Sequence, residues 1–233
     1  SLIDRTGRRA AVVLAEGTAP ESGVLATLDP ATVPDGYYVL RVAAADMGGR
    51  RSVQETLVEV AQPEKSGRIL EEWTDAQVTL DGIAFDLVRR YDSLSAGAPG
   101  RGNLAPGWSF RGLDVAVEPE RGVDELAAAG LAGALAEGDR VLVRLPDGGT
   151  MGFRFAPEAR DEGGLTVWAP RWVADDPAAG WSLATESARL DRVGGGFYVS
   201  GTGEPYNPAA VVDDGADYVV TGPDGLRRAI DAQ

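Results

Sequence analysis

Apolar and polar residues alternate over short runs along most of this chain. In the run Ile83–Arg89 the apolar residues Phe85 and Leu87 fall on one face of an extended segment. A period of two residues is typical of β-strands. Asp81-Gly82, between this run and Gln77–Leu80, is a strong signal for a tight hairpin turn. The pattern therefore predicts a β-hairpin over residues 77–89.

The first 62 residues show the same alternation. Residues 37–46 place Tyr38, Leu40 and Val42 on one face, and a second run, Ser52–Val60, returns after a glycine-containing turn. The stretch LDPATVPDGYYVLRVAAADMGGRRS is similar to the last strands of bacterial immunoglobulin-like or fibronectin-like sandwiches. A complete sandwich needs about 100 residues, so residues 1–62 are predicted to form a partial one. Its first strands would lie upstream of Ser1, or the half-sandwich would pack on the rest of the chain.

The rest of the chain divides into a linker and a longer strand region. Residues 63–72 are mostly polar and begin with Pro63, which favours a linker, and residues 73–233 contain further short strands between turn clusters such as Asp147-Gly148-Gly149. Residues 122–138 are rich in Ala and Leu but contain Gly130 and Gly133, so one short helix or a loop is predicted near residues 123–137. The predicted fold is all-β with minor helix.

Composition removes several classes of function. The net charge is −14 over 233 residues, and nucleic acid is not an expected partner because phosphate binding requires a basic face. Histidine and cysteine are absent, which excludes zinc sites, Ser-His-Asp and Cys-His catalysis, and disulfides. No apolar run approaches the roughly 18 residues that span a bilayer, so membrane insertion is not expected. No signal peptide is recognised before the strand-forming region at Ser1, and we interpret the chain as a piece of a longer protein.

The segment Tyr91-Asp92-Ser93 ends a predicted strand just before a loop rich in Gly and Pro. We expect Asp92 to accept backbone N–H bonds from that loop and the Tyr91 ring to pack on Trp108. Ser109 is expected to face outward, and it lacks the histidine that would activate it as a nucleophile. These residues are therefore predicted to be structural, and the chain is not expected to be an enzyme.

Two other groups of residues leave binding hypotheses open. Oxygen ligands for Ca²⁺ could come from the acidic clusters, although none has EF-hand spacing and a solvated turn is the usual explanation of such clusters in a chain this acidic; the clusters are Asp175-Asp176, Asp213-Asp214 with Asp217, and Glu71-Glu72 with Asp75. Trp168 and Trp172 would share a face on a regular strand and could stack on a sugar, although Pro170 lies between them. The alternative is that these indoles are buried in the core.

One stretch resembles a known family. Arg89, Tyr91-Asp92-Ser93 and Gly107-Trp108-Ser109 match the R-x-YDS strand, Gly-rich loop and G-W-S sequence that introduce the repeats of RHS/YD-repeat proteins, a family of very large bacterial β-strand shells. The resemblance covers roughly residues 68–233. It is looser at residues 196–208, GFYVSGTGEPYNP.

The resemblance implies a role and a location. Residues 73–233 would begin an antiparallel β-shell that encloses a toxin or effector at the C-terminal end of the same polypeptide, and the immunoglobulin-like module would precede them. The expected partner is then the rest of the protein's own chain, in a secreted or surface-located bacterial polymorphic toxin. The family's self-cleaving aspartates lie at the far end of the shell, so no catalytic residue and no cofactor are carried over. The alternative is a secreted or surface carbohydrate-binding or adhesion module, with or without Ca²⁺.

Overall fold

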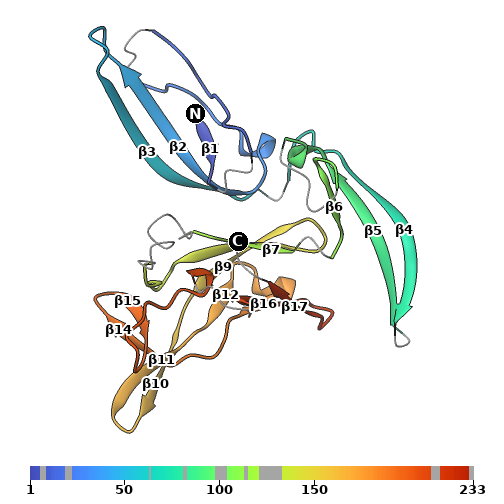
Figure 1. Ribbon diagram of the computed structural model, residues 1–233, viewed down its shortest axis with the longest axis vertical. Helices are drawn as coiled ribbons and strands as arrows, with labels where there is room; N and C mark the ends of the chain where they lie inside the picture. The colour runs from blue at the N-terminus through green and yellow to red at the C-terminus, as the bar shows by residue number, and fades with distance from the viewer. Residues whose placement is uncertain are drawn as a thin grey trace. The chain divides into compact units, whose positions relative to one another are not determined.

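The computed structural model describes residues 1–5, 9–18, 23–62, 64–80, 83–97, 104–112, 115–120, 133–210 and 216–230. The chain divides into two compact units, Ser1–Asp114 and Val115–Gln233. The described residues form antiparallel strands joined by turns and single-turn 3-10 helices, without an α-helix, which confirms the all-β prediction (Figure 1). The 3-10 helices are η1 (Pro30–Thr32), η2 (Ser93–Ser95), η3 (Pro177–Ala179) and η4 (Pro208–Ala210).

The first unit begins with a three-stranded sheet of order β1-β2-β3, comprising β1 (Leu2–Asp4), β2 (Gly36–Ala45) and β3 (Arg51–Val60). Its small core consists of Leu2, Val33, Tyr38 and Val60. The described part of residues 1–62 contains a single sheet. These residues alone therefore do not form the two packed sheets of a sandwich. At the β2–β3 turn, hydrogen bonds from Arg50 to the Asp46 carboxylate lower the pKa of that group.

The second sheet of this unit has the order β4-β5-β6, with β4 (Leu70–Leu80), β5 (Ile83–Asp92) and β6 (Trp108–Phe110). The hairpin predicted over residues 77–89 is confirmed and extends further, because Leu70 already pairs with Asp92. A β-bulge between Thr74 and Ala76 shifts the register of β4 against β5. The predicted linker is shorter than expected, because residues 70–72 belong to β4.

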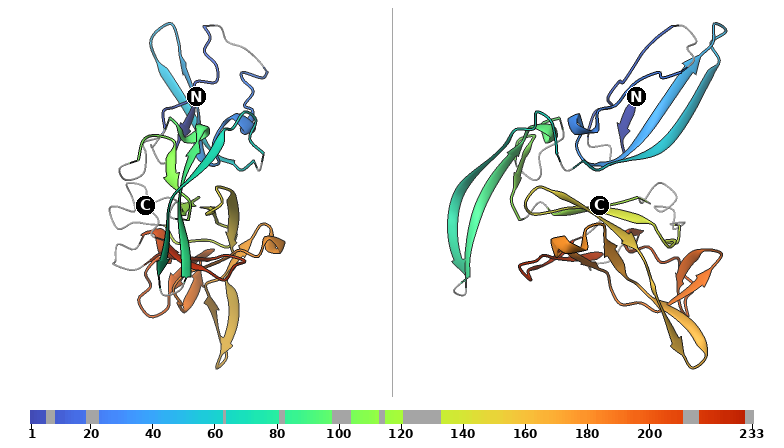
Figure 2. Two further views of the ribbon diagram at one scale, coloured as in Figure 1. Left: turned by 90° about the vertical axis from the view of Figure 1, so that its right-hand side faces the viewer. Right: turned by 180° about the vertical axis from the view of Figure 1, so that it is seen from behind.

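The described residues of the second unit, coloured from yellow-green to red in Figure 2, form three small antiparallel sheets. Their strand orders are β12-β9-β8-β7, β10-β11-β14-β15 and β13-β16-β17. The strands are β7 (Ala116–Pro119), β8 (Arg140–Arg144), β9 (Thr150–Phe155), β10 (Glu158–Glu162), β11 (Leu165–Ala169), β12 (Trp172–Ala174), β13 (Ser182–Ala184), β14 (Leu190–Val193), β15 (Gly196–Val199), β16 (Tyr218–Thr221) and β17 (Arg227–Ile230). All three sheets contribute to one hydrophobic core, which includes Phe155, Phe197 and Tyr218.

The helix predicted near residues 123–137 lies mostly outside the described residues. Residues 133–137, which are described, are not helical, and Ala136 instead forms a β-bridge with Gly196. Its backbone N–H also donates to the Asp139 carboxylate. Within the described residues, no helix is long and apolar enough to cross a membrane.

Candidate functional site

The two halves of the motif lie on neighbouring strands. Tyr91 of β5 pairs with Trp108 of β6, and Arg90 pairs with Ser109. The loop between the strands is closed by the Asp92 N–H, which donates to the Gly107 carbonyl at 2.8 Å. Residues 15 to 19 positions apart in the sequence are therefore held side by side by backbone pairing.

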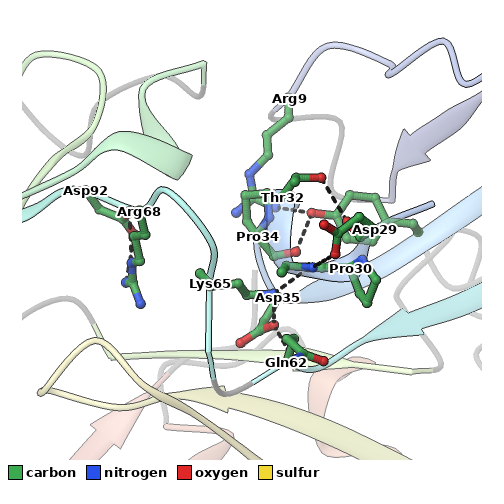
Figure 3. Close-up of polar contacts among 12 residues, drawn as sticks. Arg9, Asp29, Pro30, Thr32, Pro34, Asp35, Gln62, Lys65, Arg68 and Asp92 are labelled. Carbon is green, nitrogen blue, oxygen red and sulfur yellow. Dashed lines mark hydrogen bonds and ion pairs between the residues drawn. The ribbon is translucent and has the colours of Figure 1, made fainter.

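Asp92 is the polar centre of this arrangement. Its carboxylate accepts the backbone N–H of Leu94 at 3.1 Å, which caps η2, as the sequence predicted. It also accepts two bonds from the Arg68 guanidinium, at 2.9 and 3.1 Å (Figure 3). Ser93 adds a further link, since its hydroxyl accepts the Ile69 N–H at 2.9 Å. The YDS segment therefore joins the start of β4, the end of β5 and the following loop.

One face of the sheet carries an aromatic group. The Trp108 ring lies 5.1 Å from Trp73 and 5.5 Å from Tyr91, measured between ring centroids, and the second contact was predicted from the sequence. The Arg89 guanidinium lies 5.3 Å from the Trp108 ring, a distance suited to a cation–π interaction. Arg89 also forms an ion pair with Asp75. Trp73 keeps 42% of its surface exposed, so one edge of this aromatic group faces water.

Gly107 is required by the contact between the two strands. Its φ is +81°, a region that side chains other than glycine rarely adopt. A Cβ at this position would lie 2.8 Å from Cε2 of Tyr91 and 3.2 Å from the Asp92 carbonyl oxygen. The glycine of the G-W-S sequence therefore allows β6 to approach the YDS segment closely.

The opposite face carries a charged group that the sequence analysis missed. Arg90 is 6% exposed, and its Nε donates to Glu72 Oε1 at 2.7 Å. Arg111 reaches the other oxygen of Glu72 at 3.1 Å. A guanidinium this buried needs a charged partner. Glu72 stands directly opposite Arg90 because the bulge between Thr74 and Ala76 shifts the register of β4 against β5.

A second polar group in this unit surrounds the single lysine of the chain. The Lys65 ammonium lies 2.6 Å from Asp35 Oδ1 and donates to the Pro30 carbonyl at 3.0 Å, and the lysine side chain is only 3% exposed. Asp35 also accepts the Gln62 N–H at 2.9 Å (Figure 3). These contacts tie the segment after β3 to the loop before β2.

The acidic residues proposed as Ca²⁺ ligands do not gather into one site. Glu72 and Asp75 take part in the ion pairs described above, Asp175 pairs with Arg140, and Asp176 caps η3 through the Ala178 N–H. Asp213-Asp214 lies outside the described residues. Within the part of the chain that the structure describes, no three Asp or Glu side chains cluster as metal ligands would.

The two tryptophans proposed as a sugar platform lie in different sheets, Trp168 on β11 and Trp172 on β12. Trp172 is 7% exposed and lies 5.2 Å from Phe155, measured between ring centroids, while Trp168 lies 6.0 Å from Phe197. The chain passes from one sheet to the other at Pro170, so the two indoles do not share an exposed face. Both pack against the core of the second unit.

That core also contains two buried tyrosine hydroxyls. Tyr206 is hydrogen-bonded to Thr185 at 2.7 Å, and burial raises its pKa to about 12. Tyr218 is fully buried, its hydroxyl has no hydrogen-bond partner among the described residues, and burial raises its pKa well above the usual range. Both hydroxyls are therefore neutral at physiological pH.

Comparison with known proteins gave no match: no family model, no curated protein and no solved structure corresponds to this chain.

Proposed function

We propose that this chain is a non-catalytic structural segment of a large bacterial RHS/YD-repeat protein. In this proposal residues 1–62 belong to an immunoglobulin-like module, and residues 73–233 begin the β-shell that encloses a toxin or effector at the C-terminal end of the same polypeptide. The segment would seed or cap the strand pairing of that shell.

The observation that carries the proposal is how the motif residues are used. Asp92 is bound to Arg68 and to the Leu94 N–H, Tyr91 packs on Trp108, and Gly107 permits their close approach. Each of these contacts holds strands and loops together. A motif whose side chains serve such contacts fits a structural role better than a catalytic one.

The long ribbons of the first unit add support. In β4 the residues from Leu70 to Thr79 are all classed as exposed, and in β3 those from Arg51 to Leu57 are exposed as well. Exposed apolar side chains on these ribbons include Val53, Leu57 and Val78. Strands this long that bury so little are expected where further protein covers them.

The test is to isolate the native polypeptide with an antibody raised against this segment, and to weigh and sequence it. We expect a chain several times heavier than the 24.3 kDa of the segment, continuing past Gln233 in Tyr-Asp-Gly hairpins. A native polypeptide close to 24.3 kDa, or one that continues without such hairpins, would contradict the proposal.

A second candidate function, a carbohydrate-binding or adhesion module, is favoured by one observation. Trp73 is 42% exposed beside Trp108, and a half-exposed indole is a suitable surface for a sugar ring. Calorimetric titration with a glycan panel, with and without a chelator, tests it. Heat that disappears in Trp73→Ala would support this function, whereas no heat with any glycan would remove it.

A further inference from the structure

We propose that the outer edge of β3 pairs antiparallel with β3 of a second copy of this chain, about a two-fold axis at Glu55. Among the described residues no strand lies against this edge, since β3 ends the order β1-β2-β3 (Figure 1). The strand is ten residues long, contains no proline or lysine, and pairs with β2 without a bulge. Such an edge is a template for another strand. The inference does not depend on the proposed function.

The direction of the backbone groups on β3 follows from the bonds on β2. Arg41 N donates to Ser1 O at 2.8 Å, and Tyr37 O accepts from Arg5 N, so the odd-numbered residues of β2 point their backbone groups toward β1. The even-numbered residues therefore point their backbone groups toward β3. The bond from Asp46 N to Arg50 O follows the same pattern at the turn, because both residues are even-numbered.

Even-numbered residues of β2 stand opposite even-numbered residues of β3, as Val42 does opposite Gln54. The even residues of β3 therefore bond to β2, and the N–H and C=O groups of the odd residues, Arg51 to Glu59, face the open edge. The Glu55 carbonyl fits this direction, since it receives the side-chain amide of Gln54 at 3.5 Å and not a strand partner.

The outward direction of the odd-numbered backbone groups restricts how two copies of β3 can pair. Only registers that place odd residues opposite odd residues satisfy the outward groups, so the two-fold axis must pass through a residue and not between two. With the axis at Glu55, Arg51 stands opposite Glu59 of the second copy, and Val53 stands opposite Leu57. Val53 and Leu57 are 54% and 42% exposed, so this pairing would cover both apolar side chains.

Neighbouring registers lose these matches. With the axis at Gln54, Val53 would stand opposite Glu55, and with the axis at Thr56, it would stand opposite Glu59. The one like-charge pair at the favoured axis, Glu55 with its own copy, is compensated on each side, because Arg41 Nε lies 2.6 Å from Glu55 Oε1. Among the registers centred on Gln54, Glu55 and Thr56, charge and apolar patterns therefore favour the one centred on Glu55.

The other long edge in this unit is built differently. β4 carries the bulge between Thr74 and Ala76, and bulges interrupt the regular spacing that an added strand needs. The outer side of β1 is occupied, since Leu2 exchanges two backbone bonds with Val12, at 2.7 and 2.8 Å. Of these three edges, the outer edge of β3 is therefore the one that is both long and without a bulge.

A single-cysteine crosslink tests the register, because the chain contains no cysteine of its own. Residues in a hydrogen-bonded antiparallel pair have Cα atoms about 5.5 Å apart, within the range that a disulfide bridges. Glu55→Cys should therefore give a covalent dimer, of twice 24.3 kDa, under mild oxidation. Val53→Cys is the matched control, because the two cysteines would lie about 14 Å apart. Equal crosslinking of both variants, or none of Glu55→Cys at high concentration, would overturn the proposal.

A charge exchange tests the same pairing without a covalent bond. Arg51 and Glu59 are eight residues apart on one strand, about 27 Å, so they cannot contact each other within one chain. Arg51→Glu and Glu59→Arg should each lower the dimer fraction measured by sedimentation, and the double variant should restore it. Single variants that leave the dimer fraction unchanged, or a double variant that fails to restore it, would refute this register.

Discussion

The buried hydroxyl of Tyr218 makes the stability of the second unit sensitive to alkaline pH. A tyrosine whose pKa is raised by folding contributes stability that is fully present below the unfolded pKa of about 10 and is lost as the pH rises toward the folded value. Tyr218 is fully buried in the core and its pKa is raised by burial. We predict that Tyr218→Phe protects the protein against alkaline unfolding.

The magnitude follows from linkage. At pH 11, ionisation of an exposed tyrosine lowers the free energy of the unfolded chain by about 1.4 kcal/mol. The buried Tyr218 of the folded chain does not ionise at this pH, so the folded state is not stabilised in the same way. Between pH 8 and pH 11 the wild-type protein should therefore lose about 1.4 kcal/mol more than Tyr218→Phe loses. At a urea slope of about 2 kcal/mol/M, the difference is a midpoint shift of about 0.7 M.

The assay is urea unfolding at pH 8 and at pH 11, with Tyr206→Phe as the comparison. Tyr206 has a pKa of about 12 and should show a similar alkaline effect, but its removal also breaks the 2.7 Å bond to Thr185. Tyr206→Phe should therefore lose about 1 kcal/mol at pH 8, where Tyr218→Phe loses little because its hydroxyl has no partner among the described residues. If Tyr218→Phe weakens between pH 8 and pH 11 as much as wild type, the linkage reasoning is refuted.

Three further substitutions test the packing. Gly107→Ala should lower the free energy of unfolding by about 1–3 kcal/mol, because its Cβ would lie 2.8 Å from Tyr91 at a φ of +81°; an unchanged urea midpoint would contradict this close approach. Lys65→Met should cost about 3 kcal/mol by leaving Asp35 without its cation, and calorimetry that finds no loss would show that the pair is solvated. Phe155→Ala should cost about 3–5 kcal/mol, since the ring is fully buried; a loss under 1 kcal/mol in guanidinium unfolding would argue against the core as described.

Local sequence patterns predicted the structural features that depend on residues close together in the sequence. The alternation and the Asp-Gly turn predicted the β4–β5 hairpin, and the Tyr91–Trp108 contact followed from motif spacing. The ion pair of Arg90 with Glu72 was not predicted, because it depends on the register between two strands, which the bulge in β4 changes partway along.

Other features depend on how distant segments pack. A four-residue spacing places Trp168 and Trp172 on one face only if the strand continues, and the chain instead changes sheets at Pro170. The division after Asp114 has no marker in composition, whereas the polar segment around Pro63, which has the composition of a linker, lies within the first unit. The bond between Arg68 and Asp92 closes over 24 residues and follows from no local pattern.

The buried ammonium of Lys65 has a consequence for chemical labelling. All other cationic side chains are arginines, whose guanidinium groups do not react with the usual acylating reagents, and the one lysine side chain is 3% exposed. A reagent that acylates lysine can reach Lys65 only when the segment after β3 separates from the loop before β2. The rate at which Lys65 is acylated would therefore measure how often this part of the first unit opens.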